Sequence, residues 1–191
     1  MSDIKKRCDW VTDDPTYIHY HDTEWGVPIY DDRLLFEFLI LEGAQAGLNW
    51  LTILKRRENY RLFFYRFDAE KIARYDYRKY QTLLQNPGII RNRLKIQSTI
   101  TNAQAYLMIK KEYPSFSNYI WQFVDGKPIQ NTQKKHADIP TTTMQSDAMS
   151  KDLKKRGFKF VGSTICYAYM QAVGMVDDHL VDCFRYKTIL L

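Results

Sequence analysis

The fold of this chain is decided by one stretch, DDRLLFEFLILE at residues 31–42. Aspartate is a strongly preferred helix N-cap, so Asp31-Asp32 predicts the start of a helix that continues through the apolar residues. Those residues cover nearly every face of the helix, which is typical of a helix buried at the centre of a protein. Gly43 and Gly47 follow and indicate a break in the helix or the close approach of another segment.

Helices joined by short loops are predicted on the C-terminal side of this stretch. They cover residues 49–64, 68–74, 76–85, 91–111, 116–123, 146–157, 163–173 and 176–183. Gly174 is expected to end the helix before it in a left-handed conformation. Residues 125–143 contain glycine, proline and a threonine run, so they predict an irregular connection. Because no run alternates convincingly with period two, the predicted fold class is all-α.

The composition limits the class of protein. Aromatic residues make up 15% of the 191 residues, and the 14 tyrosines are more than a core needs. The formal net charge of +6 is a moderate indication of a polyanionic partner, although a soluble basic protein would also carry it. The odd number of cysteines, 3, argues against a disulfide framework and for a reducing compartment.

The sequence contains no candidate membrane or export segment. The charged residues after Met1 have no apolar stretch behind them, which argues against a signal peptide. The most apolar region, residues 34–54, is interrupted by Glu37, Glu42 and Gln45 and is therefore not a simple membrane span. We expect a cytoplasmic protein with no membrane partner, and nothing in the sequence suggests more than a monomer.

Two residue pairs at opposite ends of the chain predict a metal site. Cys8 and His21 stand near the start, and His179 and Cys183 stand near the end. Two thiolates and two imidazoles form a ligand set that tetrahedral zinc prefers. The i, i+4 spacing of the second pair places both side chains on one helix face, whereas the first pair requires a turn or loop folded back on itself. Four protein ligands leave no open position, so we expect one structural zinc ion per chain; the alternative is two exposed histidines and two buried free thiols.

One carboxylate occupies an unusual position. Glu42 follows Leu35 by seven residues and Phe38 by four, so it falls on the buried stripe of the central helix. Burial alone would raise its pKa, and a perturbed pKa in a cleft is a marker of a functional site. The alternative is a core glutamate that pairs with an arginine or caps the next helix.

Aromatic side chains near the same segments favour the functional interpretation of Glu42. They belong to Trp10, Tyr17, Tyr20 and Trp50. Such amphipathic rings can wall a slot in which a flat ligand stacks, although each ring taken singly is more simply explained by core packing.

A second candidate site lies in the sequence QNPGIIR at residues 85–91. A Pro-Gly turn before a helix with a basic first turn is the helix-hairpin-helix arrangement, whose backbone N–H groups hold a DNA phosphate without reading sequence. The residues expected to contact DNA are Pro87, Gly88, Ile89 and Arg91. The usual hairpin has a second glycine where this chain has Ile90, so an ordinary turn between helices is an equally good interpretation.

Several segments together resemble the bacterial DNA-3-methyladenine glycosylase I family. They are DPTYIHYHD (14–22), EWGVP (24–28), LEGAQAGLNW (41–50), KKRGFKFVG (154–162) and Asp178-His179, and the likeness spans residues 8–183. The resemblance implies an all-helical helix-hairpin-helix DNA glycosylase with a zinc ion joining its termini. It places the metal ligands on Cys8, His21, His179 and Cys183. It places the base-contacting residues on Glu42, Tyr20 and Trp50, with Trp10 and Tyr17 beside them.

The resemblance also implies a domain organisation and an activity. Residues 1–191 would form a single catalytic unit of two packed helical lobes, with the helix-hairpin-helix region at about 35–125. The enzyme would flip N3-methylated adenine out of alkylated double-stranded DNA and release it as free 3-methyladenine, a step of base excision repair. Many helix-hairpin-helix glycosylases carry an aspartate some two dozen residues after the hairpin, but residues 91–113 contain none.

The chemistry of the lesion fits this absence. N3-methyladenine is already cationic, so it departs as a neutral base without a proton from the enzyme. We therefore expect Glu42 to recognise the base and to stabilise developing positive charge, with activation of the attacking water as an alternative role. No lysine in the sequence stands in a motif that indicates Schiff-base formation, so we expect base release without cleavage of the DNA strand.

Two other functions stay open. A non-enzymatic, zinc-stabilised module that binds DNA damage would carry the same motifs. A zinc hydrolase acting on small molecules would need a vacant coordination position, which four protein ligands deny. The sequence leaves open how strictly 3-methyladenine is preferred over 3-methylguanine.

Overall fold

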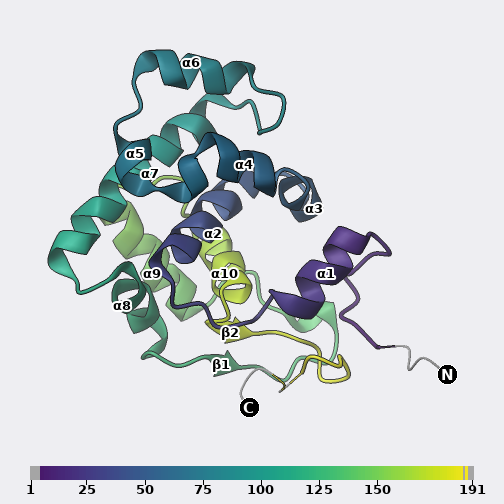
Figure 1. The fold of residues 1–191 in the computed structure, drawn as a ribbon. Coiled ribbons are helices and arrows are strands. Elements are labelled where there is room, and N and C mark those ends of the chain that lie inside the picture. The colour runs from purple at the N-terminus through teal and green to yellow at the C-terminus, as the bar shows by residue number, and fades with distance from the viewer. Residues whose placement is uncertain (1–4, 187, 189–191) are drawn as a thin grey trace.

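The fold is built from helices, as predicted (Figure 1). The structure is a computed structural model, and it describes residues 5–186 and 188. The α-helices are α1 (Pro15–Thr23), α2 (Asp32–Gln45), α3 (Trp50–Leu54), α4 (Arg57–Phe63), α5 (Ala69–Ala73), α6 (Tyr77–Gln85), α7 (Arg93–Glu112), α8 (Phe116–Trp121), α9 (Met144–Lys155) and α10 (Ser163–Ala172). Short 3-10 helices lie between them as η1 (Tyr65–Phe67), η2 (Gln122–Val124) and η3 (His136–Asp138). The described residues contain one sheet, a parallel pairing of β1 (Ile129–Gln130) with β2 (Val176–Asp177), so the all-α expectation holds apart from this short pairing.

The central position predicted for residues 31–42 is confirmed. Asp31 caps α2 by accepting a hydrogen bond from the Leu34 N–H at 2.8 Å. All residues from Leu35 to Ala44 are buried, and α2 packs against α3, α7, α8 and α10. Each large apolar side chain buried in this way stabilises the fold by about 1.5–3 kcal/mol, so a helix covered on every side organises the core.

The single helix predicted over residues 49–64 is wrong, because the chain turns between α3 and α4. The Arg56 N–H donates to the Ile53 carbonyl at 2.9 Å, an i to i−3 bond that tightens the end of α3 and redirects the chain. A second change of direction follows α4, where Tyr65, Arg66 and Phe67 all have positive φ angles, between 49° and 58°. Residues other than glycine rarely adopt this backbone conformation, and the sequence pattern did not predict it.

The helix predicted over residues 176–183 is also wrong. Val176 and Asp177 instead form β2, and the Asp177 carboxylate accepts a hydrogen bond from the His179 N–H at 3.1 Å. Such a hydrogen bond from the backbone to a nearby side chain competes with the backbone hydrogen bonds that a helix would form. The loop expected between Cys8 and His21 contains α1, for which Asp14 is the N-cap and Pro15 the first residue.

Two contacts position the ends of α2 and α10. The Lys95 ammonium at the start of α7 donates to the carbonyls of Ala44 and Ala46 at 2.7 and 2.8 Å, and thereby caps the end of α2. Gly174 ends the predicted helix over 163–173 with φ +71°, as expected, and a Cβ there would lie 2.3 Å from the carbonyl carbon of Val27 and from the nitrogen of Pro28. The segment after α1 is therefore held tightly against the end of α10.

The two terminal segments lie together. The Phe184 N–H donates to the Lys6 carbonyl at 2.9 Å, and the Lys6 ammonium pairs with the Asp182 carboxylate. Figure 1 shows α1 in purple close to the yellow C-terminal segment. None of the helices in the described residues is both long enough and apolar enough to span a bilayer.

Candidate active site

Glu42 is a buried carboxylate without a partner. Its exposed fraction is 5%, and it makes no hydrogen bond or ion pair with any of the described residues. Burial raises its pKa from 4.5 to about 8. The alternative of an arginine-paired core glutamate describes Glu37 instead, and Asn49 rather than Glu42 caps α3.

A cavity of about 460 Å³ opens beside Glu42. All four aromatic residues named from the sequence line it, together with Glu42. Burial raises the pKa of both Tyr17 and Tyr20, and the nearby Glu42 carboxylate adds to this shift. The two tyrosines therefore stay protonated and lie within electrostatic reach of Glu42.

The aromatic rings form a continuous wall. The centroids of Tyr20 and Trp50 lie 5.6 Å apart, and those of Trp10 and Tyr17 lie 5.0 Å apart. These separations are typical of favourable aromatic pairs. The indole N–H of Trp10 is buried and has no acceptor among the described residues, so it is an unused donor in the cavity wall.

More than half of the residues that line the cavity were not predicted from the sequence. The added residues are Trp25, Gln45, Leu48, Asn49, His136, Ile139, Ala168 and Gln171. Trp25 belongs to a segment that carried the family resemblance, but nothing in its spacing assigned it a role. Its ring centroid lies 5.0 Å from that of Trp10 and 4.6 Å from that of His179, so it joins the cavity to the predicted metal site.

The predicted metal ligands come together, three of them closely. Cys8, His21 and Cys183 are buried, and their ligand atoms lie within 4.8 Å of one another. The group could hold a metal ion. His179 is not in this tight group, but its ring centroid lies 5.1 Å from that of His21. A hydrogen bond between the two thiols raises the pKa of Cys8 and lowers that of Cys183.

The surroundings of these side chains fit a metal. The Nδ1 atoms of His21 and His179 bond to the carboxylates of Asp22 and Asp177 at 2.8 and 2.7 Å. These bonds leave Nε2 of each ring as the ligand atom, and carboxylate support of this kind is usual around zinc-binding histidines. The Nε2 atom of His179 is buried and has no hydrogen-bond partner among the described residues. The Leu180 and Arg185 N–H groups donate to the Cys8 and Cys183 sulfurs at 3.5 Å, and each of these bonds favours the thiolate form that binds a metal.

The predicted hairpin lies between α6 and α7, away from the cavity lining. Gly88 leaves little room for a side chain, because a Cβ there would lie 2.9 Å from Cγ of Asn59 and the Asn59 side chain would have to shift. Ile89 is buried, whereas Pro87 and Arg91 are exposed. The Ile90 N–H donates to the Tyr60 hydroxyl at 3.2 Å, so the position that usually carries the second glycine uses its donor within the protein.

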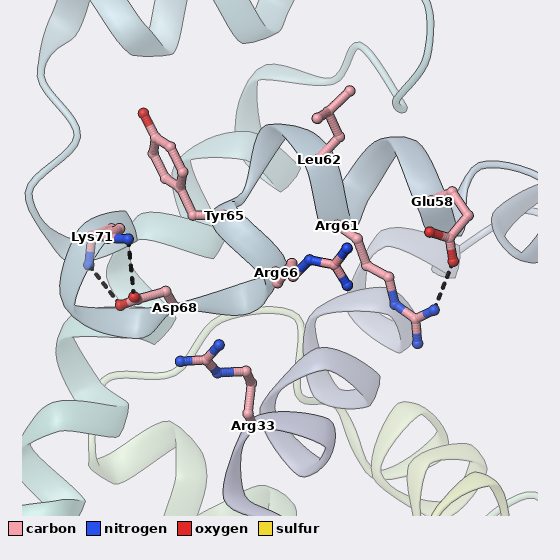
Figure 2. A pocket seen from close by; sticks show the side chains of 8 residues that line it. All are labelled: Arg33, Glu58, Arg61, Leu62, Tyr65, Arg66, Asp68 and Lys71. Carbon is pink, nitrogen blue, oxygen red and sulfur yellow. Dashed lines mark hydrogen bonds and ion pairs between the residues drawn. The ribbon is translucent and has the colours of Figure 1, made fainter.

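A second hollow, of about 490 Å³, lies near the start of α2. Half of the residues that line it are basic, and two of these cations are paired with acidic side chains (Figure 2). Arg61 bonds to Glu58 at 2.6 Å, and Lys71 lies 3.6 Å from Asp68. Both carboxylates are neutralised, so this hollow lacks the buried, unpaired acid that distinguishes the cavity at Glu42.

Comparison with known proteins defines the class. A crystal structure of 3-methyladenine DNA glycosylase I superposes on this fold with a TM-score of 0.92 and 55% identity, over 94% of this chain and 98% of that one. The protein is thus a mainly helical DNA glycosylase, an enzyme that hydrolyses N-glycosyl bonds. A second structure, of a variant glycosylase I in complex with 3-methyladenine, matches with a TM-score of 0.91 and 40% identity over 94% of this chain and 97% of that one.

The sequence comparisons identify the family. The methyladenine glycosylase family model matches residues 10–186. DNA-3-methyladenine glycosylase 1 of Escherichia coli (strain K12) is 52% identical over 181 residues, 95% of this chain and 97% of the relative. The chain belongs to the methyladenine glycosylase family, as its resemblance to that family predicted.

Proposed function

We propose that this glycosylase releases 3-methyladenine from alkylated double-stranded DNA, as a step of base excision repair. The observation that carries the proposal is Glu42, a buried carboxylate at an aromatic cavity that has no hydrogen-bond or ion-pair partner in residues 5–186 and 188. A fixed negative charge among aromatic faces suits a flat cation, and the nucleotide of N3-methyladenine presents one. The related enzyme that has been solved with 3-methyladenine supports the same substrate.

Binding energy from the cavity offsets the cost of flipping the base. Extrusion of a damaged base costs a few kcal/mol. Stacking of the flipped base on Tyr20 and Trp50 stabilises the bound state by about 1–3 kcal/mol per base. An aromatic face also favours a cationic over a neutral ring by roughly 0.5–2 kcal/mol, which selects the lesion over normal adenine.

Glu42 adds electrostatic recognition. Its carboxylate can accept a hydrogen bond from the exocyclic amine, and its charge attracts the cationic ring. Because a nearby cation favours the ionised form, substrate binding lowers the pKa of Glu42 from about 8. The cation and the carboxylate are thus stabilised together in the closed site.

The reaction itself needs little from the protein. The bond between C1′ and N9 breaks, and its electron pair neutralises the charge on the departing base. Positive charge develops on the sugar, where the Glu42 carboxylate can stabilise it. The oxygen of a water molecule then bonds to C1′, and this water releases one proton to the solvent. No amine attacks the sugar in this scheme, so the glycosylase is monofunctional and leaves the strand intact.

One zinc ion per chain is the second part of the proposal. Cys8, His21, His179 and Cys183 would hold it, with Asp22 and Asp177 orienting the two imidazoles. Bound zinc would supply a link between the terminal segments and no reactive position. The unused Nε2 atom of His179 supports its role as the fourth ligand.

The turn over residues 86–92 is proposed to bind the DNA backbone as a helix-hairpin-helix element. Pro87 and Arg91 are exposed, and the N-terminal backbone N–H groups of α7, a helix of 20 residues, follow directly. Those N–H groups suit a phosphate oxygen. The two-lobe organisation, the monomeric state and the cytoplasmic location stay predictions.

Incubation with methylated duplex DNA tests the proposal. We expect chromatography to detect free 3-methyladenine and gel analysis to show unbroken strands. Tight binding of the methylated duplex without any released base would instead support the damage-binding module and contradict the proposed enzyme. Strand cleavage concurrent with base release would contradict the monofunctional mechanism alone.

A further inference from the structure

A buried carboxylate behind the cavity organises one of its walls. Asp178 is almost fully buried and accepts hydrogen bonds from Tyr167, Gln171 and Asn131 at 2.6, 2.7 and 2.7 Å. A carboxylate with three donors is well satisfied, so it holds these donors in place. Of the three donor residues, only Gln171 lines the cavity that contains Glu42.

The Gln171 amide can adopt only one orientation in this network. The Asp178 carboxylate is the acceptor for all three residues, so the amide nitrogen of Gln171, its donor end, faces Asp178. The Nε2 atom is thereby used, at 2.7 Å from the Asp178 carboxylate. The Oε1 atom has no donor among the described residues, and it is the part of the amide left for the cavity.

We propose that Gln171 is a specificity-determining residue that selects a 6-amino purine over a 6-oxo purine. The inference rests on the proposed function, because it concerns the base held beside Glu42. The exocyclic amine of 3-methyladenine has two N–H donors, and Gln171 and Glu42 supply two acceptors in one cavity. Each acceptor takes one of these donors.

A guanine lesion meets the opposite arrangement. 3-Methylguanine carries a carbonyl oxygen at position 6, which accepts and does not donate. Placed between Glu42 and Gln171, this oxygen would face two acceptors without a proton between them. A site whose buried polar groups are left unpaired rejects a ligand strongly. The fixed amide is needed for this selection, because a freely rotating glutamine would turn its NH₂ group toward the carbonyl.

The variant Gln171→Met tests the inference, with Tyr167→Phe as its matched control. Each substitution removes one donor from Asp178, but only the first removes an acceptor from the cavity. The experiment measures the initial rates at which 3-methyladenine and 3-methylguanine leave the same methylated duplex. Thermal unfolding of each variant checks that it is folded. If Gln171→Met does not fold, Gln171→Ala takes its place.

We expect Gln171→Met to lower the ratio of 3-methyladenine to 3-methylguanine release about tenfold, the effect of one lost hydrogen bond, and Tyr167→Phe to leave the ratio unchanged. An unchanged ratio in a folded Gln171 variant overturns the inference, and so does an equal fall in Tyr167→Phe. In both cases the wild type still releases 3-methyladenine, so the proposed function survives. A wild type that releases neither base removes the proposed function and this inference with it.

Discussion

Glu37 and Glu42 lie five residues apart on α2 and are both buried, but within the part of the chain that the structure describes only Glu37 has cationic partners. The Glu37 carboxylate lies 2.5 Å from Nε of Arg57 and 2.8 Å from the Arg61 guanidinium. Arg57 also pairs with Glu24, which joins the end of α1 to α2 and α4. One acid of the central helix is therefore part of an ion-pair network, and the other has no such pair and borders the cavity.

The two acids should respond to neutralisation in opposite directions. Glu37→Gln leaves Arg57 buried with one partner fewer, so we expect it to lower the free energy of unfolding by about 3–5 kcal/mol. Glu42→Gln replaces an unpaired buried acid by a neutral isostere and should raise the free energy of unfolding at alkaline pH. Urea unfolding of both variants measures this contrast. A loss of stability in Glu42→Gln would show that the carboxylate has a structural partner.

The stabilising effect of Glu42→Gln should depend on pH. The folded-state pKa of Glu42, about 8, lies above the ordinary 4.5, so the folded state retains a proton that the unfolded state loses. The protonated Glu42 therefore contributes fully to the free energy of unfolding at a pH below the pKa of the unfolded state. This contribution is lost as the pH rises toward the pKa of the folded state. The difference in free energy of unfolding between Glu42→Gln and the wild type should grow with pH to the order of a few kcal/mol, and should level off above pH ~8. A gap independent of pH would mean that Glu42 titrates normally.

The pH dependence of the reaction should report the same group. Values of kcat/KM reflect ionisations of the free enzyme, and the cationic lesion requires the ionised form of Glu42. We expect kcat/KM for methylated duplex to rise with pH and to reach a plateau above about pH 8, following the pKa of Glu42. The residual rate of Glu42→Gln should lack this rise. A wild-type profile that is flat between pH ~6 and ~9 would exclude an ionised Glu42 as the essential group.

The metal proposal predicts one zinc ion per purified chain. Loss of either C-terminal ligand, in His179→Ala or Cys183→Ala, should reduce the zinc content and lower the melting temperature. Cys166→Ala is a matched control, because Cys166 is also a buried free thiol but lies outside the cluster. Metal analysis and thermal unfolding follow all three variants. A metal-free wild type of full stability would end the proposal.

The hairpin proposal predicts a rescue. Gly88→Ala forces a Cβ against the Asn59 side chain, so it should displace the turn and weaken binding to undamaged duplex. Asn59→Gly removes the obstructing atoms, and the double variant should regain affinity. The salt dependence of binding should become shallower in Gly88→Ala alone, because phosphate contacts are lost. Equal DNA affinity for the wild type and Gly88→Ala would indicate an ordinary turn between helices.

Local signals were sufficient to predict much of the fold. The cap at Asp31 and the apolar run identified α2, and Gly174 marked the end of α10. Asp14-Pro15 is a further cap-and-proline signal, and it marks the start of α1 between Cys8 and His21. The i, i+4 spacing of His179 and Cys183 suggested a helix, but Asp177 bonds to the backbone and β2 pairs with a distant segment. Spacing cannot reveal such competition.

The site was predictable only where residues share a segment. Glu42 and Trp50 stand on consecutive helices, and their types suggested a pocket. Gln171 and His136 reach the same cavity from segments more than eighty residues away, with no pattern that links them to Glu42. The ion pairs of Glu37 depend likewise on how α4 packs against α2, so the sequence alone could not distinguish the paired acid from the free one.

The most direct test of the account is the single-turnover rate at which wild type and Glu42→Gln release 3-methyladenine from methylated duplex. Removal of one electrostatic stabiliser from a closed site typically costs about 10²–10³ in rate, and we predict a loss of that size in a variant that remains folded. Equal rates for a folded Glu42→Gln and the wild type would contradict the central claim that this buried carboxylate acts on the cationic base.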